Sequence, residues 1–233
     1  MNYIKALKNH PLFYGIDKIN IQILLECFHF QPKKYKKNEY IIMEGDKVQY
    51  IGIILQGTIL MEKNDYYGNN YFFTELREHE LFAEPFMSSS LQKSTVNYKA
   101  ITNCSILIFP YKLIWKVCSK NCYFHSVFTE NLMNLLALKT RILLAKIEIL
   151  SKRSIRERLL TFLNMIRIGQ DIIGLSHINK PENLKENELY IPLNYTEIAE
   201  YLSVNRSAFE RELTKMKAEN IISIKNNIFC LYI

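Results

Sequence analysis

The sequence has 233 residues, of which 48% are hydrophobic and 23% are charged. This composition excludes a disordered chain, and a chain of this length usually holds more than one domain of about 100–200 residues. No apolar run approaches the ~18–20 residues that a bilayer span needs, and residues 1–13 lack the apolar stretch of a signal peptide, so we expect a cytoplasmic protein. The formal net charge of +7 is spread along the chain, so solvated surface charge explains it as well as a polyanionic partner does.

Two kinds of pattern occupy the first 120 residues. From Asp17 to Phe28 apolar residues recur at helical spacing, which predicts a short amphipathic helix. Short apolar runs then alternate with turn residues such as Glu44-Gly45-Asp46. The runs are residues 40–43, 50–55, 58–61, 71–73, 97–101 and 105–109. Many short strands at close spacing predict an antiparallel jelly roll or β-roll, so we expect a sensor domain over residues 1–120.

Residues 121–150 contain no Gly or Pro and are predicted to form one long helix. An apolar stripe with alternating spacings of three and four runs from Phe128 to Ile149, with Asn131 as a polar member, and is typical of a coiled-coil seam. The candidate residues of this homodimer seam are Leu135, Leu138, Ile142 and Ile149. A second stripe beside it contains Leu132, Leu136, Leu143, Ile147 and Leu150. The alternative is a single buried helix in a monomer.

Residues 151–233 carry signals for a third segment. Ser154 and Glu157 form a capping box for a helix that ends near Ile168. Residues 170–187 are polar and predict a loop with at most one short strand. The pair Asn194 and Glu197 forms a second capping box that begins another helix.

The last 45 residues carry the candidate functional element. A tight turn at Ser203-Val204 is followed by Asn205, which is predicted to cap a second helix. Two short helices joined in this way are typical of a helix-turn-helix, although a plain helical hairpin shares the spacing. The apolar runs on either side of Lys225-Asn226-Asn227 predict a β-hairpin, the wing of a winged helix. An Arg at a helix N-terminus can bond guanine O6 and N7 together. The candidate DNA-binding residues are Thr196, Asn205, Arg206, Ser207, Arg211 and Lys215.

Several short motifs accompany this order of elements. They are residues 10–13 (His-Pro-Leu-Phe), 36–42, 44–46 (Glu-Gly-Asp), 50–57 and 204–213. The first four are similar to the cyclic-nucleotide-binding-type β-roll of the Crp/Fnr superfamily of bacterial transcription regulators, and the last resembles its recognition helix. The resemblance covers nearly the whole chain. It implies a homodimer that binds an inverted-repeat operator in double-stranded DNA, with RNA polymerase and a small-molecule effector as further partners.

The chain departs from this family in the effector pocket. In the family's cyclic-nucleotide binders a Gly-Glu pair holds the ribose, and an Arg-Ser pair about ten residues on holds the cyclic phosphate. This sequence has Ala83-Glu84 and Gln92-Lys93-Ser94 in these places. A Lys meets a phosphate as a point charge and not bidentately, so we expect an effector other than cyclic AMP. The candidate effector-binding residues are Glu84, Lys93 and Ser94. In the helix-turn-helix, Ser203 replaces the usual turn Gly, and Ser207 replaces a Glu that accepts from cytosine in well-known members.

The remaining reactive residues show no catalytic or metal-binding pattern. The five cysteines (Cys27, Cys104, Cys118, Cys122 and Cys230) are scattered and are expected to be reduced thiols. The histidines form no metal-binding motif, and no phosphate loop or nucleophile elbow occurs. We therefore expect no enzyme activity, no metal and no other cofactor. The sequence predicts a dimeric, sequence-specific DNA-binding regulator; the alternative is a ligand-binding module that acts through protein partners without DNA.

Overall fold

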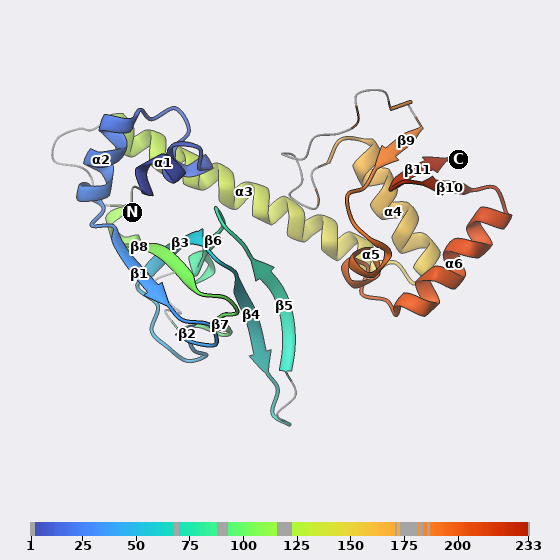
Figure 1. Ribbon diagram of the computed structural model, residues 1–233, viewed down its shortest axis with the longest axis horizontal. Coiled ribbons are helices and arrows are strands. Elements are labelled where there is room, and N and C mark those ends of the chain that lie inside the picture. The colour runs from blue at the N-terminus through green and yellow to red at the C-terminus, as the bar shows by residue number, and fades with distance from the viewer. Residues whose placement is uncertain are drawn as a thin grey trace. The chain divides into compact units, whose positions relative to one another are not determined.

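The computed structural model describes residues 3–67, 70–87, 93–115, 123–170, 172, 181, 184–185 and 187–232. Cys118, Cys122 and most of the predicted loop over residues 170–187 lie outside these ranges. The chain forms two compact units, Met1–Leu135 and Leu136–Ile233, and helix α3 (Tyr123–Ser151) contributes to both (Figure 1). The finer division at residues 120 and 150 stays a prediction. Within the described residues, no helix combines the length and the apolar character needed to cross a membrane.

The N-terminal unit is built on two four-stranded antiparallel sheets (Figure 1). One has the strand order β1-β8-β3-β6 and the other the order β2-β7-β4-β5. The strands are β1 (Gln31–Tyr35), β2 (Tyr40–Ile42), β3 (Tyr50–Gln56), β4 (Ile59–Asn64), β5 (Asn70–Leu76), β6 (Leu81–Phe82), β7 (Asn97–Ala100) and β8 (Cys104–Pro110). This arrangement confirms the predicted β-roll.

The two sheets enclose a core of branched and aromatic side chains that includes Ile54, Ile59, Phe82, Tyr98 and Ile106. These residues come from strands of both sheets. Since alternate side chains of a strand point to opposite faces, each sheet directs one set of side chains into the space between the two sheets. Gly57, in the turn between β3 and β4, has a φ of +94°, and a Cβ at this position would lie 2.5 Å from the backbone oxygen of Asn103. Only glycine fits this turn without displacing the backbone.

Helical segments complete the N-terminal unit. They are α1 (Tyr3–Lys8), α2 (Lys18–Cys27), the short 3-10 segments Pro11–Phe13, Glu84–Phe86 and Tyr111–Leu113, and the first part of α3. The predicted helix at 17–28 is confirmed, with Asp17 as its N-cap. Phe128 of α3 is fully buried, with ring centroids 5.5 Å from Phe13 and 4.6 Å from Phe28.

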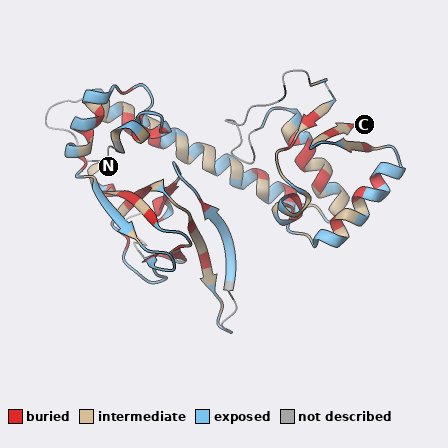
Figure 2. Ribbon diagram, viewed as in Figure 1, coloured by how far each residue is buried: buried red, intermediate tan, exposed pale blue. Residues whose placement is uncertain are grey.

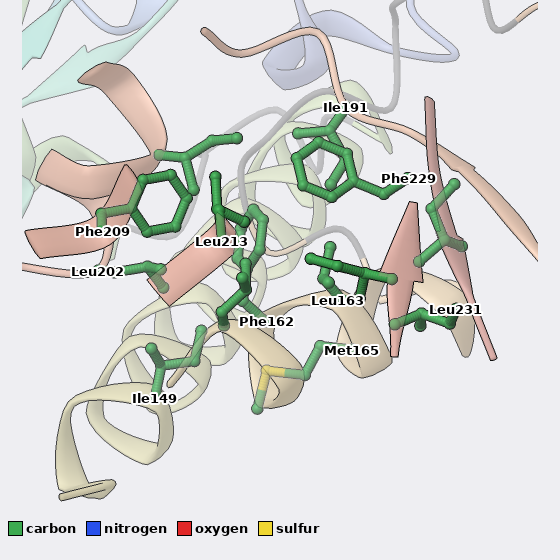
Figure 3. Packing of buried hydrophobic residues seen from close by; sticks show 14 of the residues in the cluster. Ile149, Phe162, Leu163, Met165, Ile191, Leu202, Phe209, Leu213, Phe229 and Leu231 are labelled. Carbon is green, nitrogen blue, oxygen red and sulfur yellow. The ribbon is translucent and has the colours of Figure 1, made fainter. Parts of the chain in front are cut away.

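The C-terminal unit combines helices with a small sheet (Figure 1). Its elements are the end of α3, α4 (Ile155–Arg167), β9 (Glu188–Tyr190), α5 (Tyr195–Tyr201), α6 (Arg206–Ala218), β10 (Ile222–Lys225) and β11 (Ile228–Leu231). The three strands form an antiparallel sheet in the order β10-β11-β9. Both predicted capping boxes are present, at Ser154 with Glu157 and at Asn194 with Glu197. Figure 3 shows Phe162 and Leu163 of α4 among side chains from α6 and β11, in the core that holds these elements together.

The apolar stripes of α3 do not face the way that the sequence predicted. Ile149 is fully buried in the core of the C-terminal unit (Figure 3), so its assignment to an exposed dimer seam is wrong. At the other end of the same stripe, Asn131 donates through Nδ2 to the backbone oxygens of Leu12 and Tyr14, at 3.1 and 2.9 Å. The other seam candidates, Leu135, Leu138 and Ile142, are partly buried. A helix that packs against its own chain has the same periodicity as a dimer seam, so the spacing alone could not distinguish them.

The face of α3 that remains open is the neighbouring one. Leu143, Leu144 and Ile147 are 62%, 59% and 63% exposed. Leu143 and Ile147 belong to the second predicted stripe. Large apolar side chains grouped on one helix face are a common mark of an interaction surface.

Candidate nucleic-acid interface

Helices α5 and α6 form a helix-turn-helix arrangement. Asn194 caps α5, and Asn205 caps α6 by accepting a hydrogen bond from the backbone N–H of Ser207 at 2.9 Å. The face of each helix that carries Ile198 and Phe209 is buried in the core of the C-terminal unit. The opposite face of α6 is therefore left to solvent, and Figure 2 shows that most of its visible surface is exposed.

The turn between the two helices is held by a regular C-capping pattern. The N–H of Val204 donates to Ala199 O and the N–H of Ser203 donates to Glu200 O, both at 3.0 Å. These are the two hydrogen bonds of a Schellman motif, whose C′ residue adopts the left-handed conformation. Ser203 occupies this position with a φ of 52°. The turn thus keeps the backbone that a glycine would favour, although the residue is serine.

The exposed face of α6 carries most of the predicted DNA-binding residues. Arg206, Ser207, Arg211 and Lys215 are all exposed, whereas Thr196 of α5 is partly buried. Arg206, Arg211 and Lys215 supply positive charge along one helix. Positive charge favours the binding of anions, and the free N–H groups and positive dipole end at the start of a helix add to this effect.

Arg206 is held in place by two neighbours. Its Nη1 donates to Thr196 Oγ1 at 2.9 Å, and its Nε donates to Glu210 Oε1 at 2.8 Å. The structure therefore brings together Thr196 and Arg206, two of the predicted DNA-binding residues. Glu210 is the additional member of this cluster. An i,i+4 spacing of Arg and Glu was the signal that could have identified it.

Three other predicted residues make hydrogen bonds within the first turns of α6 or at its N-cap. The Asn205 side chain caps α6, and the Ser207 hydroxyl donates to Asn205 Oδ1 at 2.6 Å. Arg211 donates through Nε to Ser207 O at 3.2 Å, which uses one of the five N–H donors of its guanidinium. Of these three, Arg211 has the most unused donor capacity for a nucleic acid.

An ionic cluster fastens α6 to α4. Arg156 donates to both carboxylate oxygens of Glu219, at 2.6 and 2.8 Å, and to Glu212 at 2.7 Å. The hydrogen bonds from Arg156 lower the pKa of the Glu219 carboxyl, because they stabilise its charged form. Fork-shaped Arg–carboxylate pairs fix orientation as well as distance. Arg156 therefore sets the position of α6 from behind its exposed face, a role that the sequence reading missed.

The wing is a tight β-hairpin. Lys225 and Ile228 pair at its end, and Asn226 and Asn227 between them have φ values of 50° and 61°. Two central residues with positive φ define a type I′ turn, the loop that matches the twist of two strands. Lys225, Asn226 and Asn227 are exposed at this tip. The predicted wing is present, and Lys225 adds a cation that was absent from the predicted site.

The predicted effector residues lie in the N-terminal unit. Ala83 has a φ of 66°, so it keeps the left-handed backbone expected of the glycine that it replaces. Glu84 is 9% exposed. The pKa of the nearby Tyr98 phenol is raised, mainly because Tyr98 is buried and further because of the Glu84 charge. Ser94 is buried and donates to Val96 O at 2.6 Å, which gives it a structural role in the turn. Lys93 is exposed, and Gln92 lies outside the described residues.

A metal site needs several ligand side chains close together. Within the described part of the chain, no three His, Cys, Asp or Glu side chains lie together as metal ligands would.

Comparisons with known proteins agree with this architecture. Residues 32–121 match the family described as the cyclic nucleotide-binding domain. A mutant of CooA from Carboxydothermus hydrogenoformans superposes with a TM-score of 0.57 at 15% identity, over 99% of this chain and 91% of that one. The catabolite activator protein of Thermus thermophilus gives a TM-score of 0.50 at 18% identity, over 95% of this chain and 93% of that one. At these identities the similarity shows a shared fold. A search of curated proteins gives no match.

Proposed function

We propose that this chain is a sequence-specific DNA-binding transcription regulator of the Crp/Fnr type, which acts in the cytoplasm as a homodimer. The observation that carries the proposal is the exposed face of α6, where Arg206, Arg211 and Lys215 follow a capped helix N-terminus. A helix of this kind fits the major groove of B-DNA with its first residues at the base edges. The shared fold of the two known proteins supports the same assignment.

The charged side chains divide into two roles. Arg206, at the first position of α6, is assigned to base readout, because its guanidinium can bond two acceptors of guanine at once. Lys215, about two and a half turns further along, and Lys225 at the wing tip are assigned to phosphates, which carry no sequence information. Two-fold symmetry then predicts an inverted repeat with half-sites about one helical turn apart.

The dimer is assigned to the open apolar face of α3. Leu143, Leu144 and Ile147 expose more than half of their surface in the single chain. Packing this face against the same face of a second copy would bury these side chains and stabilise the dimer by about 25 cal/mol for each Å² of apolar area removed from water. The revised surface replaces the seam that included Ile149.

The effector is expected to be a molecule other than cyclic AMP. Lys93 is exposed and Ser94 is engaged with Val96, so the two do not form the fork that clamps a cyclic phosphate. Glu84 is a buried acidic group next to the expected effector pocket and is the first candidate for a contact with a hydroxyl-bearing ligand.

The test is selection of bound duplexes from a random-sequence DNA pool by the full chain. We expect enrichment of an inverted repeat and a mobility shift with a duplex of that sequence. An absence of enrichment, together with stable folding, would instead favour the ligand-binding module that acts through protein partners.

A further inference from the structure

We propose that Lys146 of α3 and Arg158 of α4 are positioning residues of the helix-turn-helix, which hold the turn before α6 by binding the carbonyl groups at the end of α5. This inference rests on the proposed function, since it concerns how the DNA-reading helix is aimed. Both residues lie in the same compact unit as α5 and α6.

The first step concerns the carbonyl groups at the end of α5. The last carbonyls of a helix have no partner within it and must be satisfied from outside. The Schellman motif at Ser203 satisfies Ala199 O and Glu200 O. It provides nothing for the three carbonyls that follow, which belong to Tyr201, Leu202 and Ser203.

The two cations satisfy these three carbonyls. Lys146 Nζ donates to Tyr201 O. Arg158 Nη1 donates to Leu202 O at 3.0 Å and to Ser203 O at 3.3 Å. Positive charge at this end also complements the negative end of the helix dipole. The turn is thus held by side chains of two other helices as well as by its own backbone.

Lys146 contacts Tyr201 in a second way. Its Nζ lies 4.1 Å from the centroid of the Tyr201 ring, within the range of a cation–π contact. That ring is itself fixed, because its hydroxyl donates to Ile172 O at 3.0 Å and it packs 5.2 Å from the Phe162 ring. Burial raises the pKa of Tyr201 to about 12, so the phenol keeps the proton for this hydrogen bond.

Arg158 joins the end of α3 to the same point. Its Nε donates to Lys152 O at 3.1 Å and its Nη2 to Leu150 O at 3.5 Å. One guanidinium therefore connects the end of α3 to the turn after α5. Burial lowers the pKa of Lys146, because the charged ammonium loses solvation, and the nearby charge of Arg158 lowers it further.

The position of this cluster determines what it can influence. Ser203 has a strained left-handed backbone, and α6 begins only three residues later at Arg206. A small change at Ser203 would therefore rotate the N-terminus of α6, where the residues assigned to base readout lie. A binding site requires its contact groups to be held within about 0.5 Å, which packing of the apolar face alone does not ensure.

The experiment compares Lys146→Met with Lys152→Met in the full chain. Both changes remove one positive charge and keep an unbranched side chain, but only Lys146 holds a carbonyl of α5. The Lys152 side chain is 37% exposed and lies 4.0 Å from Glu148, so it serves as the matched control. The readouts are the Kd for a duplex selected by the unmodified chain, the Kd for a scrambled duplex, and the melting temperature of each variant.

We expect Lys146→Met to weaken binding of the selected duplex by at least about tenfold and of the scrambled duplex by less than about threefold. Lys152→Met should weaken both duplexes by the same small factor. Lys146→Arg, which keeps a donor and the charge over the ring, should restore most of the affinity. All measurements are made well below the melting temperature of the least stable variant, so that loss of folded protein does not contribute.

Two results would overturn the inference. One is binding of the selected duplex by Lys146→Met within about twofold of Lys152→Met. The other is an equal loss on selected and scrambled duplexes, which would indicate a purely electrostatic contribution. If the unmodified chain enriches no duplex at all, the proposed function fails and this inference fails with it, and that outcome is distinct from both results.

Discussion

Replacing Arg206 tests how the exposed face of α6 reads DNA. In the free chain Arg206 is engaged with Glu210 and Thr196, so it must exchange these contacts for a base. The ion pair with Glu210 is largely exposed, with side-chain exposures of 61% and 42%, and i,i+4 pairs of this kind contribute about 0.3–0.5 kcal/mol. A bidentate contact with guanine contributes about 1–3 kcal/mol of discrimination. The base contact therefore outweighs the ion pair that it replaces.

Arg206→Ala should weaken binding of the selected duplex by about 1–3 kcal/mol, which corresponds to roughly 5- to 150-fold in Kd. It should also relax the preference at one base pair of each half-site. Glu210→Ala should leave binding unchanged or tighten it by about two- to fivefold, because it releases Arg206 and removes a negative charge beside the proposed reading residue.

Fluorescence anisotropy with the selected duplex and its single-base-pair variants measures both effects. Arg206→Lys is the matched control, since it keeps the charge but not the planar fork. It should lose base preference while keeping the dependence of affinity on salt. An unchanged base preference in both Arg206 variants would refute the assignment of α6 as the reading helix.

Four further outcomes are expected. Lys215→Ala should weaken all duplexes alike and reduce the slope of log K against log salt by about 1, as a titration with NaCl would measure; a loss confined to one sequence would contradict this. Ile147→Glu should convert the proposed homodimer to a folded monomer in sedimentation experiments, whereas Ile149→Glu should unfold the C-terminal unit, because Ile149 is buried; a folded dimer of the Ile147→Glu variant would exclude the proposed face. The pKa of Glu219 is lowered by Arg156, so the stability that this carboxylate adds is present above its ordinary pKa of 4.5 and is lost as the pH falls through its folded pKa. The difference in melting temperature between the unmodified chain and Glu219→Gln should accordingly shrink below pH 4.5, and a constant difference would argue against this pair. Calorimetry should show no binding of cyclic AMP at micromolar concentration, and a micromolar Kd would overturn the prediction about the effector pocket.

Local sequence signals predicted much of this fold correctly. Each capping box and the Asn226-Asn227 turn depend on residues within a few positions of one another, so the sequence contains all the partners.

Segments without such signals were missed. Strand β1 contains Pro32, Lys33 and Lys34, an exposed and polar run that is tolerated because β1 lies at the edge of its sheet and bonds only to β8 there. Strand β6 has two residues, too few for a periodic pattern. Such strands form because a neighbouring strand offers hydrogen-bonding groups. When that neighbour is distant in sequence, the local residues carry no signal that predicts the pairing.

The candidate site divides in the same way. The capped helix that begins at Arg206, and the cations along it, could be predicted from the residues alone, since capping and helical periodicity are local properties. The stripe of α3 that remains open could not be predicted in this way, because burial of Ile149 depends on a core assembled in three dimensions from α4, α5, α6 and the small sheet. The same holds for Lys146 and Arg158, which are 55 and 44 residues away along the chain from the carbonyl groups that they bind after α5. The folded chain brings these cations to the end of a helix, where carbonyl groups need partners from outside the helix.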